Sequence, residues 1–340
     1  MMALNSNEEP SKSTSFRLEK ITTISVDDHE FITPTQTVLC REDMYVWRRS
    51  QTCHDYFLFI TSLNETIKGK PLSVDCEKSP IVHEIATLLA KIEEWIDQHV
   101  PTTLSLRGRS EVFKIWHARL KNEANRLLSE ALPEEFYNSV MEIVVYFMES
   151  FGSPVHFNYG PRHEMSFGLF LCCLIRIGAL TAKDQEGIIT VVFVSYIKVI
   201  HKLQTTYGLR YARRHGVWQL DDPMYLPYIW GSSQLIGHPH VYPSSIIESE
   251  CVDMYSQDYM FLACVKHINE IRAGSIAEHS IQLWNLSGVP SWPKINEHLL
   301  NIRYREDVLG KFQIVHQTLV GSLMTMQPCA REPEWMFKFF

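Results

Sequence analysis

Apolar side chains recur three and four residues apart along much of this chain, and this spacing restricts its fold more than any other feature. From Tyr45 onward, large side chains fall on one face of a helix with 3.6 residues per turn, namely Trp47, Tyr56, Phe59, Ile60, Leu63 and Ile67. The Lys68-Gly69-Lys70-Pro71 sequence that follows is typical of a helix C-terminus. This segment therefore predicts a helix that ends just before Gly69.

The same periodicity predicts helices over most of the remaining sequence, in the ranges 81–96, 108–133, 136–148, 163–177, 184–207, 258–272 and 293–304. In the Val- and Ile-rich stretch 187–197, local propensity would also allow a strand. Its length and its continuation through Lys198 and Lys202 favour a buried helix, which Asp184 can cap. Asn-Gly and Asp-Gly hairpin signals are absent and no solenoid-length repeat is evident, so we expect an all-α fold in one compact helical unit.

Size and charge narrow the class of protein. The chain has 340 residues of which 45% are hydrophobic, enough to bury a large core in one large or two ordinary domains. It carries 32 basic and 39 acidic residues, a formal net charge of −7. A chain of this charge has no overall positive field to hold nucleic acid or an anionic membrane. No segment has the run of about 18 apolar residues that a membrane helix needs.

The eight cysteines include no CxxC pair, and the N-terminal sequence has no apolar export region. We therefore expect reduced thiols and a location in the cytosol, with the nucleus as a further possibility. Residues 1–40 are rich in Ser, Thr, Glu and Lys with little apolar periodicity, so they are expected to form a poorly ordered polar tail.

Two adjacent carboxylates, Asp221 and Asp222, follow the Gly216-Val217-Trp218 sequence and precede an aromatic and Gly-Ser-Ser-Gln segment. Such a pair can bind a divalent ion or hold a peptide backbone through hydrogen bonds, and Trp218 can stack on a proline ring. The alternative is an Asp that caps the next helix and a Trp that packs in the core. Residue types alone favour this alternative, because short motifs often match by chance.

Other catalytic patterns are excluded or weak. His163-Glu164 resembles part of a zinc-protease motif, but position 167 is Phe and the second histidine is missing. Glu164 can instead complement the dipole of its own helix. Cys172 and Cys173 lie on an apolar helix, where packing is the simpler role. The sequence contains neither a G-x-S-x-G elbow nor a GxxxxGK[ST] loop.

The run from Gly216 to Asp222 resembles the G-V-W-G-L-D-D motif of the phosphotyrosyl phosphatase activator family, with Gln219 in place of a glycine. Members of this family activate protein phosphatase 2A and are also described as peptidyl-prolyl isomerases. Further similar segments follow the family order between residues 45 and 325, and they include Arg49-Ser50-Gln51, Phe170-Leu171-Cys172-Cys173-Leu174, Asp258-Tyr259-Met260-Phe261-Leu262, Gln282-Leu283-Trp284-Asn285 and Val289-Pro290-Ser291-Trp292. This agreement reverses the preference stated above for the carboxylate pair.

The resemblance implies a single helical domain over residues 41–327, in which core, linker and lid subdomains surround a peptide-binding groove, and a diverged tail over 328–340. It implies that Trp218, Asp221 and Asp222 take part in catalysis. It implies a metal site at Gly216 and Asp222. It also implies contacts to a proline-containing peptide or partner protein from Gly216, Val217, Trp218, Tyr225 and Gln234.

The family binds ATP and Mg²⁺ at an interface with the phosphatase, and the matching positions here are His156, Asn158, Pro161, Arg162, Gln313 and Ile314. Most are substituted. The family pattern D-Y-G-T-G-H-E begins here with Asn158, a neutral oxygen ligand in place of a charged one. Pro161 has no N–H to offer a phosphate, and Arg162 stands where the family has glycine. His156 replaces an arginine that could clamp a phosphate. We therefore expect weakened nucleotide binding, as in a diverged paralogue.

Two functions fit these observations. The first is an activator of protein phosphatase 2A type catalytic subunits that acts as a peptidyl-prolyl isomerase or conformational chaperone. The alternative is a non-catalytic regulator that binds the phosphatase but has lost ATP-dependent activation. The loop with Asn158, Pro161 and Arg162 is the feature that separates them.

Overall fold

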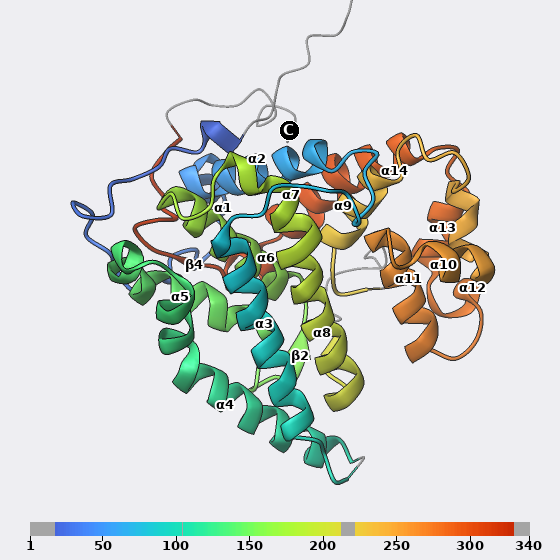
Figure 1. The fold of residues 1–340 in the computed structure, drawn as a ribbon, viewed down its shortest axis with the longest axis horizontal. Coiled ribbons are helices and arrows are strands. Elements are labelled where there is room, and N and C mark those ends of the chain that lie inside the picture. The colour runs from blue at the N-terminus through green and yellow to red at the C-terminus, as the bar shows by residue number, and fades with distance from the viewer. Residues whose placement is uncertain (1–17, 104, 212–221, 330–340) are drawn as a thin grey trace, which may run out of the picture.

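A computed structural model describes residues 18–103, 105–211 and 222–329 of the chain. As predicted, helices dominate these ranges (Figure 1). In Figure 1, α4 and α5 lie towards the lower left, α10, α12 and α13 at the right edge, and α9 between these groups. The Gly216, Val217, Trp218 and Asp221 positions lie outside the described residues.

The first predicted helix is present but divided in two. α1 covers Met44–Arg49 and α2 covers Gln51–Thr66. Ser50 between them is extended, and its side chain accepts the backbone N–H of Cys53 at 3.1 Å, so it caps α2. Gly69 has φ of +68°, the left-handed conformation that a glycine adopts readily after a helix.

The helices predicted up to residue 207 are all present. They are α3 (Pro80–Gln98), α4 (Leu106–Ala131), the 3₁₀ turn η2 (Glu134–Ser139) with α5 (Val140–Met148), α6 (Pro161–Arg176), and a continuous run of η4 (Ala182–Asp184), α7 (Gln185–Gly187), η5 (Ile188–Phe193) and α8 (Val194–Tyr207). The short turn η3 (Glu149–Phe151) follows α5. The Val- and Ile-rich stretch is helical, with a π-helical turn at η5. The N-cap is Thr181 and not Asp184 as predicted; Asp184 lies three residues later and accepts the backbone N–H of Thr181 at 2.9 Å, which completes a capping box.

The second half contains helices that periodicity predicted together with others that it did not. The elements are α9 (Leu226–Gln234), η6 (Pro243–Ile247), α10 (Ser249–Tyr255), α11 (Met260–Ile271), α12 (Ile276–His279), α13 (Ile281–Ser287), α14 (Trp292–Glu297), the π-helical η7 (His298–Leu309) and α15 (Phe312–Val315). Of these, α11 matches the predicted range 258–272, and α14 with η7 matches 293–304.

Strands are confined to two short pairs among the described residues. β1 (Thr35–Gln36) pairs antiparallel with β4 (Leu319–Val320), with Thr35 opposite Val320. β2 (Asn158–Tyr159) pairs in parallel with β3 (Arg210–Tyr211). Each pair brings together segments far apart in the sequence.

A few side chains in the described part of the N-terminal tail are buried, and the expectation of poor order for residues 1–40 stays a prediction. Leu18, in the turn η1 (Leu18–Lys20), and Ile21 and Val38 are each buried in the core. Isolated apolar residues of this kind leave no periodic signal, because the segment runs over the helices without forming one. Residues 1–17 lie outside the described residues.

Three buried tryptophans tie helices together through their ring N–H groups. Trp47 donates to the carbonyl of Leu309 at 3.0 Å, and Trp116 to that of Ile92 at 3.1 Å. The ring N–H of Trp230 on α9 donates to the carbonyl of Ile60 on α2 at 3.1 Å. Each contact satisfies the polar atom of an otherwise apolar side chain in the core.

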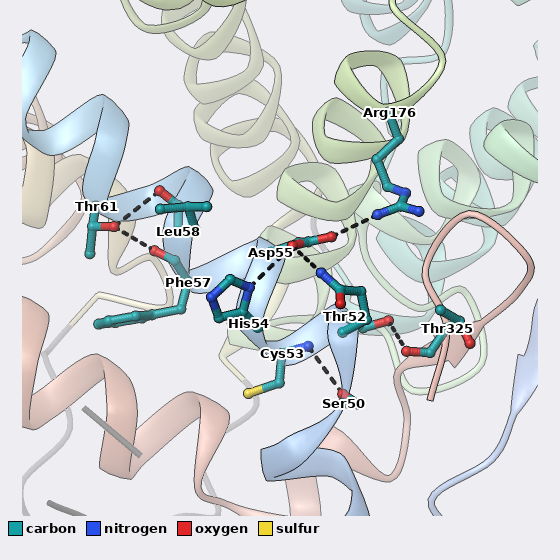
Figure 2. Close-up of polar contacts among 11 residues, drawn as sticks. Ser50, Thr52, Cys53, His54, Asp55, Phe57, Leu58, Thr61, Arg176 and Thr325 are labelled. Atoms are coloured by element: carbon teal, nitrogen blue, oxygen red, sulfur yellow. Dashed lines mark hydrogen bonds and ion pairs between the residues drawn. The ribbon is translucent and has the colours of Figure 1, made fainter. Parts of the chain in front are cut away.

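A buried ion pair joins α2 to the end of α6 (Figure 2). Arg176 Nη1 lies 2.7 Å from Asp55 Oδ2, and the Asp55 side chain is 1% exposed. Asp55 Oδ1 also accepts a hydrogen bond from Gln51 at 2.6 Å, and His54 Nδ1 lies 3.2 Å from the same oxygen. The network fixes the first turns of α2 against α6, which carries part of the candidate site.

Eight free cysteines are present, four of them buried. Among the described residues, none of the helices combines the length and apolar character that spanning a lipid bilayer requires.

Candidate functional site

A buried carboxylate holds the N-terminus of α9. Glu164 lies in the first turn of α6 and is fully buried. Its oxygens accept the backbone N–H of Tyr225 at 2.9 and 3.0 Å and that of Leu226 at 3.0 Å. The first N–H groups of a helix have no partner inside it, so Glu164 supplies acceptors that α9 lacks. The sequence predicted an effect on its own helix only; the structure adds this contact to a second helix.

The protonation of Glu164 is shifted by its surroundings. Burial raises the pKa of Glu164 to about 8, although the N–H donors of Tyr225 and Leu226 lower it, and the nearby charge of Asp222 adds to the rise. A carboxyl group with a pKa near neutrality can hold or release a proton under ordinary conditions. The hydrogen bonds from Tyr225 and Leu226 nevertheless give this carboxyl group a structural role, which is to hold the N-terminus of α9 in place.

Asp222 is the described member of the predicted carboxylate pair, and it lies four residues before Leu226, the first residue of α9. Its side chain is buried and accepts the backbone N–H of Met224 at 2.9 Å and the hydroxyl of Tyr228 at 2.9 Å. This is a local turn before α9 and not the helix cap of the alternative interpretation, because the N-cap position of α9 is Tyr225 and Glu164 binds its first N–H groups. The catalytic and metal-binding roles of Asp222 stay predictions.

Tyr225 lies beside a cavity of about 380 Å³. The rest of the lining comes from α13, α14, η7 and the loop between α13 and α14, and its apolar side chains are Leu286, Val289, Ile295 and Leu299. The Tyr225 ring packs edge-on against Tyr304, with centroids 6.0 Å apart. A concave, largely apolar space of this size is typical of a site for a small molecule or a short peptide segment.

Gln234, the other predicted peptide contact outside the Gly216–Asp222 run, lies at the end of α9 and is 1% exposed. Its amide nitrogen donates to the carbonyl of Lys70 at 3.1 Å, and its oxygen accepts the N–H of Met260 at 3.1 Å. Both polar atoms thus join α9 to neighbouring segments. The contact of Gln234 with a peptide stays a prediction.

Comparison with known proteins decides the family. Residues 34–326 match the sequence model described as phosphotyrosyl phosphate activator (PTPA) protein. The probable serine/threonine-protein phosphatase 2A activator 1 of Dictyostelium discoideum is 36% identical over 301 residues, which cover 88% of this chain and 92% of that protein. The serine/threonine-protein phosphatase 2A activator 2 of Candida albicans is 35% identical, over 86% of this chain and 83% of that protein.

This chain belongs to the PTPA family. The serine/threonine-protein phosphatase 2A activator of Drosophila melanogaster is similar too, with 31% identity over 84% of this chain and 72% of that protein. The crystal structure of the phosphatase activator Ypa1 superimposes with a TM-score of 0.81 and covers 91% of this chain, at 24% identity. The compact helical fold of the PTPA family, which the sequence predicted, is therefore confirmed.

The PTPA-family nucleotide positions before and at the start of α6 hold little that could bind a phosphate. Pro161 is the first residue of α6 and has no N–H, while His156 is exposed in the preceding turn. Asn158 belongs to β2, and its carbonyl accepts the N–H of Ser153 at 2.8 Å. Arg162 lies 3.0 Å from the carboxylate of Glu149, so its charge is already compensated.

The two remaining nucleotide positions lie on α15, which packs against α6. Ile314 is 2% exposed and belongs to the core. Gln313 lines a second cavity of about 390 Å³ together with Arg41, Arg48 and Lys311. The structure therefore brings the two groups of positions to adjacent helices, but it places Ile314 away from solvent.

The described groups before and at the start of α6 offer few ligands for a nucleotide or Mg²⁺, and weakened nucleotide binding stays a prediction. Within the described ranges, no group of three or more His, Cys, Asp or Glu side chains is placed to hold a metal ion. Both oxygens of Asp222 accept hydrogen bonds, and Arg162 is paired with Glu149. Mg²⁺ prefers carboxylate oxygens and water, and a phosphate prefers unpaired cations and free N–H groups.

Sequence reasoning missed the basic side chains of the first cavity, Lys294, His298 and Arg303. They come from α14 and η7, and none stands in a motif. Their shared position becomes evident only in the folded protein, where residues of α13, α14 and η7 line one cavity.

Proposed function

We propose that this protein activates catalytic subunits of protein phosphatase 2A type. The observation that carries the proposal is the family match over residues 34–326, supported by relatives that are named as activators and align over 84–88% of this chain. The alignment leaves no large segment of the described fold unmatched. The expected partner is therefore the phosphatase catalytic subunit itself.

The physical basis of activation is differential binding. An accessory protein shifts a conformational equilibrium only by binding one state more tightly than another. The rigid support for such binding is the α6–α9 junction, where Glu164 fixes the N–H groups of Tyr225 and Leu226. Acting as a conformational chaperone in this way requires no covalent chemistry.

We further propose that the protein acts as a peptidyl-prolyl isomerase on a proline-containing segment. The uncatalysed barrier to rotation of a peptide bond is about 18–20 kcal/mol. A site lowers this barrier when it binds the twisted amide more tightly than either planar isomer. Tyr225, with the apolar wall of Leu286 and Ile295, provides a surface for the proline ring. The catalytic roles of Trp218 and Asp221, which lie outside the described residues, stay part of this proposal.

Activation is proposed to depend only weakly on ATP and Mg²⁺. The Arg162–Glu149 ion pair, the missing N–H of Pro161 and the buried Ile314 support this part of the proposal. The first experiment is a reactivation assay of purified, inactive phosphatase catalytic subunit with this protein, with and without ATP and Mg²⁺. We expect reactivation with little nucleotide dependence. Failure to bind or reactivate the subunit would reject the proposal.

A triple variant tests the loop directly. Asn158→Asp, Pro161→Thr and Arg162→Gly together restore the family pattern at these positions. If the loop accounts for the weak dependence, this variant gains ATP-stimulated activation over the wild-type protein. Glu149→Gln is the control, since it frees Arg162 from its ion pair without restoring the loop.

The isomerase role has a separate test. Asp222→Ala is compared with the wild-type protein in an isomerisation assay on a proline-containing peptide. Because Asp222 also holds Met224 and Tyr228, circular dichroism and Tyr228→Phe report whether any loss comes from the fold of this turn. An unchanged rate in Asp222→Ala would show that this carboxylate does not support catalysis.

A further inference from the structure

The cavity beside Tyr225 has an apolar wall and basic side chains around it. The apolar side chains of the lining are Leu286, Val289, Ile295 and Leu299. The basic side chains are Lys294, His298 and Arg303. None of the described residues that line this cavity is acidic. The charged side chains of this lining are basic, whereas the chain as a whole has a formal net charge of −7.

The basic side chains differ in how much of their charge is compensated. Arg303 donates its Nε–H to His298 Nε2 at 3.1 Å, and its Nη1 lies 3.6 Å from Asp307 Oδ2. His298 therefore acts as an acceptor, which is the role of a neutral imidazole. Lys294 is exposed and has no carboxylate within ion-pair distance among the described residues. It is the charge at this cavity that remains available to a ligand.

The surroundings extend the apolar surface beyond the cavity. On α13, Ile281 and Trp284 are 57% and 44% exposed, and on η7 Ile302 is 44% exposed. Exposed large apolar side chains next to a concave site are typical of a surface that binds a polypeptide. The amide side chains of Gln282 and Asn285, which line the cavity, match the hydrogen-bonding groups of a peptide backbone.

We propose that this cavity binds a client segment in which an acidic side chain stands next to an apolar one, and that Lys294 recognises the acidic side chain. The apolar residue packs between Tyr225 and the wall of Ile295 and Leu299, and the carboxylate pairs with the Lys294 ammonium group. The occupant follows from charge complementarity, because the cavity offers an uncompensated cation and no anion. This inference rests on the proposed function, for which it names the class of peptide sequence.

The test measures binding of fluorescein-labelled short peptides by fluorescence anisotropy. Three peptides share a Leu-Pro core and carry Glu, Gln or Lys at the next position. At low salt we expect the Glu peptide to bind about fivefold more tightly than the Gln peptide, the upper range for an ion pair at a protein surface. The preference should shrink as salt is added, because exposed charges are screened.

A charge reversal identifies the residue responsible. Lys294→Glu should abolish the preference for the Glu peptide and favour the Lys peptide. Lys183→Glu is the matched control, since Lys183 is also exposed but lies on η4 away from the cavity. Equal binding of the three peptides to the wild-type protein, or a preference that survives Lys294→Glu, would overturn the inference.

The phosphatase reactivation assay separates this inference from the proposed function. Reactivation by wild-type protein without any charge preference among peptides would overturn the acidic-segment inference and leave the activator function intact. A charge preference that depends on Lys294, in a protein that does not reactivate the phosphatase, would support the binding site and reject the activator function.

Discussion

The carboxylate of Glu164 on α6 accepts the backbone N–H of Tyr225 with both of its oxygens, at 2.9 and 3.0 Å. This contact joins the centre of the helical core to the residue that borders the candidate cavity. Tyr225 is also the residue before α9, so the same bonds set where that helix begins. The position of the cavity wall therefore depends on one buried acidic group.

The first prediction concerns the pH dependence that this group confers. The pKa of Glu164 is raised by burial from its usual value of 4.5 to about 8. Between these values the folded protein holds a proton that the unfolded chain has released, so the stability contribution of Glu164 falls as pH rises. We expect Glu164→Gln to remove this dependence, which amounts to at most about 1.4 kcal/mol per pH unit.

The measurement is the free energy of urea unfolding of both proteins across this pH range. Relative to the wild-type protein, Glu164→Gln should become more stable with increasing pH. Glu94→Gln, at an exposed position on α3, controls for the loss of one negative charge. If the two curves stay parallel, ionisation of Glu164 is not coupled to folding.

The second prediction concerns the buried ion pair between α2 and α6. Asp55→Ala leaves Arg176, whose side chain is 10% exposed, without its carboxylate. An uncompensated buried charge typically costs about 3–5 kcal/mol of unfolding free energy. Glu111→Ala is the control, because Glu111 and Lys114 form an exposed pair that should contribute less than about 1 kcal/mol. Urea unfolding measures the loss of unfolding free energy in Asp55→Ala and in Glu111→Ala. Equal losses in the two variants would contradict a strong contribution from the buried pair.

The third prediction tests the contact between α9 and α11. A Cβ atom added at Gly231 would lie 2.4 Å from the backbone nitrogen of Phe261, so the two helices would have to separate. We expect Gly231→Ala to destabilise the protein by about 1–3 kcal/mol or more. At Gly288 the nearest atom is 3.6 Å away, and Gly288→Ala should have a small effect. Thermal unfolding that ranks the two variants in the opposite order would refute the close packing.

Long amphipathic helices could be predicted from this sequence because one face is apolar and the other polar. α3 is such a helix, with Ile85, Leu89, Ile92 and Ile96 buried in succession. α9 could not be predicted in this way, because every residue from Leu226 to Gln234 is buried, including its glycine and two serines. A helix surrounded on all sides has no polar face, and periodicity carries no information about it.

The candidate site was only partly predictable for a related reason. Asp222 and Tyr225 belong to a run of residue types that rarely occur together, so this run can be recognised from the sequence alone. Glu164 is separated from Tyr225 by 61 residues, and nothing local indicates that the two meet. Lys294 reaches the cavity only through the packing of α13, α14 and η7. Such contacts arise from tertiary structure, which spacing along the chain does not encode.

The final prediction concerns two stacked histidines between α8 and α11. The rings of His201 and His267 are 3.6 Å apart and nearly parallel, and His267 Nε2 lies 3.1 Å from Gln204 Oε1. Burial lowers the pKa of His267 from 6.5 to about 4 and that of His201 well below its usual value. Here the unfolded chain binds the additional protons, so the stability contribution is present above pH 6.5 and is lost as pH falls towards 4.

We expect His267→Gln, whose amide can still reach Gln204, to lose stability less steeply than the wild-type protein over this acidic range. The difference between them should change by up to about 1.4 kcal/mol per pH unit. His83→Gln, at an exposed position on α3, should follow the wild-type curve. Acid-dependent urea unfolding checks this expectation, because a His267→Gln curve that coincides in shape with wild type would mean that His267 takes up no proton on unfolding.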